Sequence, residues 1–74
     1  MPREEGVVIE WRPAADLGRI RMPDARIVGM TRAGLAAPPE AFAVGTRVTF
    51  VLKRGVWGWT ARDVRPVATT EATA

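Results

Sequence analysis

Hydrophobic and polar residues alternate with a period of two along most of this chain. The clearest case is TRVTFVLK, residues 46–53, where Val48, Phe50 and Leu52 share one face and mostly polar residues occupy the other. This spacing is typical of a half-buried β-strand. Arg54 and Gly55 predict a turn after it. Residues 57–64 then predict a second strand, in which Gly58 marks a bulge or a close backbone approach, so the two strands form a hairpin.

Three further strands are predicted upstream, over residues 7–11, 17–22 and 26–30, with a Pro23-Asp24 turn between the last two. The connection 31–44 contains Pro38 and Pro39 and predicts one short helical turn near residues 33–35 before an irregular loop. We expect flexible ends over residues 1–5 and 67–74, and one domain over 6–66. This order predicts an all-β protein, a five-stranded antiparallel barrel of the OB type. An SH3-like barrel, which also has five short strands, is the alternative.

The composition limits the chemistry available to the chain. Its 74 residues include no Cys, His, Ser, Asn, Gln or Tyr. Disulfides, thiolate or imidazole metal sites and a nucleophilic triad are therefore excluded, and we expect neither an enzyme nor a bound metal or cofactor. No apolar run approaches the roughly 20 residues of a membrane span, and MPREEG lacks the apolar stretch of a signal peptide. We therefore expect a cytoplasmic protein without a membrane partner.

Basic residues are concentrated in the middle of the chain. The whole sequence carries 11 Lys and Arg against 8 Asp and Glu, a net charge of +3. Residues 17–65 alone carry nine basic residues against three acidic ones, a balance of +6. Such an excess attracts polyanions, including nucleic acids. The basic residues of this part are Arg19, Arg21, Arg26, Arg32, Arg47, Lys53, Arg54, Arg62 and Arg65.

Two segments resemble the bacterial cold-shock proteins and related cold-shock domains. GVVIEWRPAADLGRI, residues 6–20, is similar without a gap to the family pattern G-x-V-K-W-F-N-x-x-K-G-F-G-F-I, and VGTRVTFVLKRGVWGWTARDV, residues 44–64, is similar to its closing segment. The resemblance covers about residues 6–64. It implies an OB-type barrel that binds single-stranded RNA or DNA. The matching positions are Gly6, Val8, Gly18, Ile20, Gly45, Val48, Phe50, Gly55, Gly58, Ala61 and Val64.

The residues that would stack on bases in that family are replaced in this chain. Glu10 stands in place of the family's stacking Trp, and Leu17 and Arg19 in place of two Phe. Gly29 and Thr31 replace the Phe and His of the third strand, and Arg32 replaces the Phe that follows them. Because each base stack is worth about 1–3 kcal/mol, the resemblance implies weak binding that depends mainly on charge.

The remaining Trp and Arg residues are the candidates for this binding. A guanidinium group can stack on a base and pair with phosphate. Trp11 is either a stacking ring, if the first strand slips by one residue, or a residue of the core. Trp57 and Trp59 share a strand face and are either a displaced stacking platform or part of the core. Protein recognition is the alternative function, since Trp and Arg are enriched at interface hot spots. The candidate nucleic-acid-binding residues are Trp11, Arg19, Arg21, Thr31, Arg32, Trp57 and Trp59.

Overall fold

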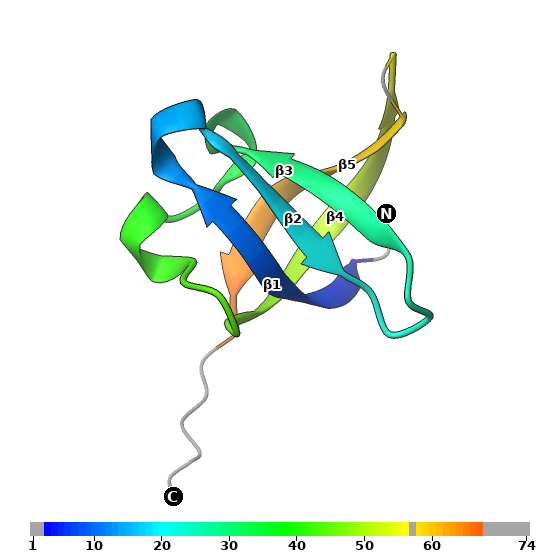
Figure 1. Cartoon of the computed structure of the whole chain (residues 1–74). Coiled ribbons are helices and arrows are strands. Elements are labelled where there is room, and N and C mark those ends of the chain that lie inside the picture. The colour runs from blue at the N-terminus through cyan, green and yellow to red at the C-terminus, as the bar shows by residue number, and fades with distance from the viewer. Residues whose placement is uncertain (1–2, 57, 68–74) are drawn as a thin grey trace, which may run out of the picture.

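The protein folds into a closed five-stranded β-barrel, seen here in a computed structural model that describes residues 3–56 and 58–67 (Figure 1). Short 3-10 turns connect some of its strands. The strands are β1 (Glu4–Arg12), β2 (Leu17–Arg21), β3 (Ile27–Thr31), β4 (Arg47–Gly55) and β5 (Gly58–Pro66). The 3-10 turns are η1 (Pro13–Ala15), η2 (Arg32–Gly34) and η3 (Pro39–Ala41).

Strand order gives the barrel its type. The strands follow one another around the barrel as β1-β2-β3-β5-β4, and β1 closes on β4. This is the five-stranded barrel of OB type that the sequence predicts. The prediction of a wholly antiparallel sheet is wrong at one pair, because β3 runs parallel to β5. The chain leaves β3 through the long connection, forms β4, and then turns back in the hairpin. As a result β5 lies next to β3 and runs in the same direction.

Strand boundaries differ from the predicted ones mainly at the ends. β1 begins at Glu4 rather than at residue 7, so the barrel includes Glu4 and Glu5, which the sequence analysis assigns to the N-terminal segment. β4 continues through the predicted turn to Gly55, which pairs with Gly58 across the hairpin end. The long connection holds two 3-10 turns instead of one, and η3 begins at Pro39, where the ring fixes a helical φ.

The barrel interior is filled by apolar side chains from all five strands. Phe42, which follows η3, is fully buried and packs into the core together with Phe50 of β4. Most of the apolar positions that carry the cold-shock resemblance lie here. The buried hydrophobic residues are Val8, Ile20, Met22, Val28, Met30, Phe42, Val48, Phe50, Ala61 and Val64.

Candidate nucleic-acid interface

Two basic residues on the outer surface are joined by a row of small residues across four strands. Arg19 of β2 pairs with Gly29 of β3, Gly29 pairs with Thr60 of β5, and Thr60 pairs with Lys53 of β4. With strands about 4.8 Å apart, the row is roughly 14 Å long. A Cβ atom at Gly29 would meet nothing within 4 Å, so the middle of the row is open. We call these four residues the Arg19–Lys53 row.

Two of the three predicted arginines are held in ion pairs. Arg19 Nε lies 3.4 Å from Glu10 Oε1, and Glu10 also pairs with Arg12. Arg32 Nε donates a hydrogen bond to Asp16 Oδ1 at 2.8 Å. The carboxylates therefore offset part of the positive charge that the sequence analysis assigns to this surface.

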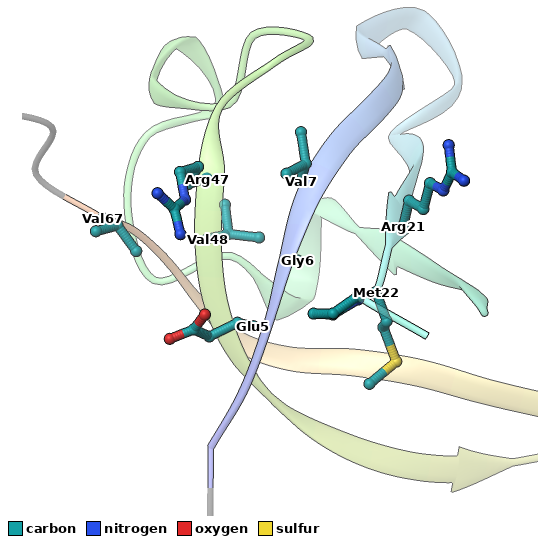
Figure 2. Close-up of a pocket in the computed structure, with 9 residues that line it drawn as sticks. Glu5, Gly6, Val7, Arg21, Met22, Arg47, Val48 and Val67 are labelled. Atoms are coloured by element: carbon teal, nitrogen blue, oxygen red, sulfur yellow. The ribbon is translucent and has the colours of Figure 1, made fainter. Parts of the chain in front are cut away.

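Arg21 and Thr31 occupy opposite ends of the β2–β3 pair. Thr31 is exposed and lies opposite Leu17. Arg21 makes no ion pair within residues 3–56 and 58–67, and it lies opposite Val7 of β1, which in turn pairs with Arg47 of β4. Figure 2 shows Arg21 and Arg47 on the two sides of Val7, around a hollow of about 320 Å³ at the base of the barrel.

A bulge in β1 decides where Trp11 points. Val8 pairs with Ile20 but Glu10 pairs with Arg19, so β1 contains one residue more than β2 between these two pairs. The bulge exchanges the faces of the residues that follow it. Trp11 therefore lies opposite Gly18 and packs against the core, while Glu10 faces outward in place of a ring. Trp11 is therefore partly buried against the core, and its role in binding stays a prediction.

Trp11 also reaches a groove that contains Arg32. The groove has a volume of about 460 Å³ and lies between the η1 turn and the segment around η3. Two predicted site residues, far apart in the sequence, thus line one hollow. Its lining residues are Trp11, Pro13, Arg32, Pro39, Glu40 and Ala43.

The β4–β5 hairpin carries a half-exposed aromatic side chain next to a basic one. It projects from the barrel in Figure 1. Trp59 is 47% exposed and pairs with Arg54, whose guanidinium carbon lies 5.7 Å from the centre of the indole ring, within range of a cation–π contact. Trp57, the other predicted ring of this hairpin, lies outside the described residues.

A groove of about 610 Å³ runs along this hairpin, and we call it the hairpin groove. Lys53, Arg54 and Arg62 line it and make no ion pair within the described part of the chain. These three residues belong to the basic excess of residues 17–65 but are not among the site residues predicted from the sequence. Alternation on the two hairpin strands could have placed Lys53 and Arg62 on the outer face, but it does not show that they line one groove with Trp59. Its lining residues are Val51, Leu52, Lys53, Arg54, Trp59, Arg62 and Asp63.

The single carboxylate of the hairpin groove is neutralised by two arginines. Asp63 sits in a bulge of β5 with a φ of 53°. Hydrogen bonds from Arg65 and from Arg3 to its carboxylate keep the pKa of Asp63 below its usual value. Arg3 also donates to Thr49 Oγ1 and to the main-chain oxygens of Thr49 and Asp63, and so ties the chain start to both hairpin strands.

Comparison of the sequence with known proteins identifies no relative of this chain. No protein-family model matches the chain, and a search of curated proteins finds no match. Within the described residues there is no group of three or more acidic, His or Cys side chains that could hold a metal ion. None of the helical segments described is long and apolar enough to cross a membrane.

Proposed function

We propose that this protein is a cold-shock-like OB barrel that binds single-stranded nucleic acid in the cytoplasm, weakly and mainly through charge. The Arg19–Lys53 row supports this function best. It places two cations at the ends of an open, small-residue floor that includes strand β3. The strand 2–3 face and the loop between strands 4 and 5 are the surfaces with which OB barrels bind oligonucleotides.

Binding is weak because the outer face holds guanidinium groups where stacking rings would give affinity. Glu10 and Gly29 supply no ring, and Glu10 repels phosphate while it pairs with Arg19. Arg19, Arg21, Lys53 and Arg62 remain to contact the backbone. Four phosphate contacts predict that log K falls against log salt concentration with a slope of about −3, at about −0.7 per contact for single strands.

A salt titration tests this function. An oligothymidylate of about eight nucleotides, within the range that one OB barrel covers, is titrated by fluorescence anisotropy at several salt concentrations. We expect saturable binding at low ionic strength and the slope given above. The proposal is wrong if neither the anisotropy nor the amide chemical shifts of the protein change at the lowest salt concentration.

Protein recognition is a second candidate function, favoured by exposed aliphatic residues among the arginines. Val7, Ile9, Leu17 and Ile27 of strands β1, β2 and β3 are 37–48% exposed. Val7 and Ile27 flank Arg21 across neighbouring strands. Aliphatic side chains alternating with Arg are suited to a partner surface that is both apolar and acidic. In a pull-down after nuclease treatment, recovery of one defined protein supports this candidate, and loss of every bound protein counts against it.

A further inference from the structure

The hairpin groove combines three chemical features in one hollow. Trp59 offers a half-exposed indole ring, and Arg54 lies within cation–π distance of that ring from the neighbouring strand. Lys53 and Arg62 add two cations to the lining. Val51 and Leu52 supply apolar surface, since both are only partly covered by the rest of the barrel. The hollow therefore offers a flat ring, positive charge and an apolar floor together.

The charge balance of the groove favours an anion. Asp63 is the only carboxylate in its lining, and Arg3 and Arg65 both pair with it, at 2.8 Å and 3.1 Å. Lys53 and Arg62 have no carboxylate within ion-pair distance among residues 3–56 and 58–67, so an incoming phosphate would not have to displace one.

The groove is also continuous with the Arg19–Lys53 row. Lys53 belongs to both, because it lines the groove and pairs with Thr60 of the row. Thr60 Oγ1 donates a hydrogen bond to the carbonyl oxygen of Lys53 at 3.2 Å, which ties the two strands together at this point. A strand that lies across Gly29 therefore reaches Lys53 and enters the groove without leaving the protein surface.

We propose that the hairpin groove holds one nucleotide of the bound strand, with its base stacked on Trp59 and its phosphate paired with Lys53 and Arg62. This inference rests on the proposed function and assigns a base-stacking subsite to it. The nucleotide chemistry follows from the combination of features, because a ring stacks on any base while the two cations bind the backbone. Recognition is then independent of base identity, since the described lining of the groove holds no side-chain amide and its carboxylate, Asp63, is paired with Arg3 and Arg65.

The test compares two ligands that share negative charge but differ in bases. Oligothymidylate of about eight nucleotides carries both bases and phosphates, whereas inorganic polyphosphate carries charge only. Trp59→Leu should weaken oligothymidylate binding roughly 5- to 150-fold and leave polyphosphate binding unchanged. Trp59→Phe should retain most of the affinity, because it keeps a stacking ring. The indole N–H resonance of Trp59 in the unaltered protein should shift more with oligothymidylate, which stacks on the ring, than with polyphosphate, which reaches only the cations of the groove.

A double variant with matched net charge tests the phosphate contacts. Lys53→Gln with Arg62→Gln should weaken both ligands, whereas Arg26→Gln with Arg47→Gln removes the same charge away from the groove and should weaken binding less. The groove assignment is overturned if the unaltered protein binds oligothymidylate, Trp59→Leu binds it as tightly as the unaltered protein, and the Lys53/Arg62 double variant binds it as tightly as the Arg26/Arg47 double variant. If the unaltered protein binds no oligonucleotide, the proposed function itself fails.

Discussion

Gly29 offers a direct way to strengthen the proposed interface. It lies in the middle of the Arg19–Lys53 row, with Arg19 on one side and Thr60 on the other. The space above it is open, because a Cβ atom there would meet nothing within 4 Å. The register of the cold-shock resemblance places a Phe of that family at this position. Gly29→Phe should therefore add a ring to the nucleic-acid path without disturbing the barrel.

The magnitude follows from the value of one base stack. A ring that stacks on one base contributes about 1–3 kcal/mol, which raises affinity for oligothymidylate roughly 5- to 150-fold. Folding stability should stay constant or rise slightly, because Gly in a strand is entropically unfavourable and aromatic residues favour strands. Gly29→Leu enters the same open space and adds apolar area without a flat ring, so it serves as the matched control.

The assay is fluorescence anisotropy of labelled oligothymidylate at low salt, together with thermal unfolding of each variant by circular dichroism. We expect Gly29→Phe to bind more tightly than Gly29→Leu, and both to melt at or above the temperature of the unaltered protein. If Gly29→Phe folds normally and binds no better than Gly29→Leu, the strand does not cross β3, and the placement of the interface on this row is refuted.

Three further predictions concern packing, charge and pH. Gly6→Ala should destabilise the fold by about 2–3 kcal/mol, since its Cβ would clash with a side-chain carbon of Ile20 and lie 2.8 Å from the main-chain oxygen of Arg21, and unfolding by urea measures this loss. Glu10→Gln should tighten oligothymidylate binding several-fold by freeing Arg19, with a steeper salt slope; unchanged affinity would show that this ion pair has no influence. The lowered pKa of Asp63 contributes stability that is present above the unfolded-state pKa near 3.8 and is lost as pH falls through the lower folded-state pKa. Asp63→Asn removes this titration. The melting temperature of the variant should therefore fall less steeply at acidic pH than that of the unaltered protein.

Interior positions of this barrel match the cold-shock sequence pattern, whereas outer positions depart from it. Val8, Ile20, Phe50 and Val64 match the family pattern and are completely buried. Glu10 departs from it and lies on the outer face. Interior positions are constrained by packing in the core, whereas exposed positions are free of that constraint. A barrel of this type can therefore keep its interior packing while the side chains on its outer face vary.

Local sequence determined the strands, because period-two alternation reports which residues of one segment share a face. Val48 and Phe50 are buried as predicted, and the β4–β5 hairpin forms, although it turns beyond Gly55 rather than at Arg54. Arg19, Arg21 and Thr31 could be placed on strands for the same reason. The excess of basic residues over residues 17–65 is likewise known from the sequence alone.

Tertiary structure alone decided which of these residues meet. The extra residue in β1 reverses the faces after it, and only pairing with β2 reveals that Trp11 turns inward. The parallel contact of β3 with β5 joins Gly29 to Thr60, residues 31 positions apart, and so brings Lys53 into line with Arg19. Periodicity is a property of one segment, whereas register between distant segments is set by closure of the barrel around a shared core.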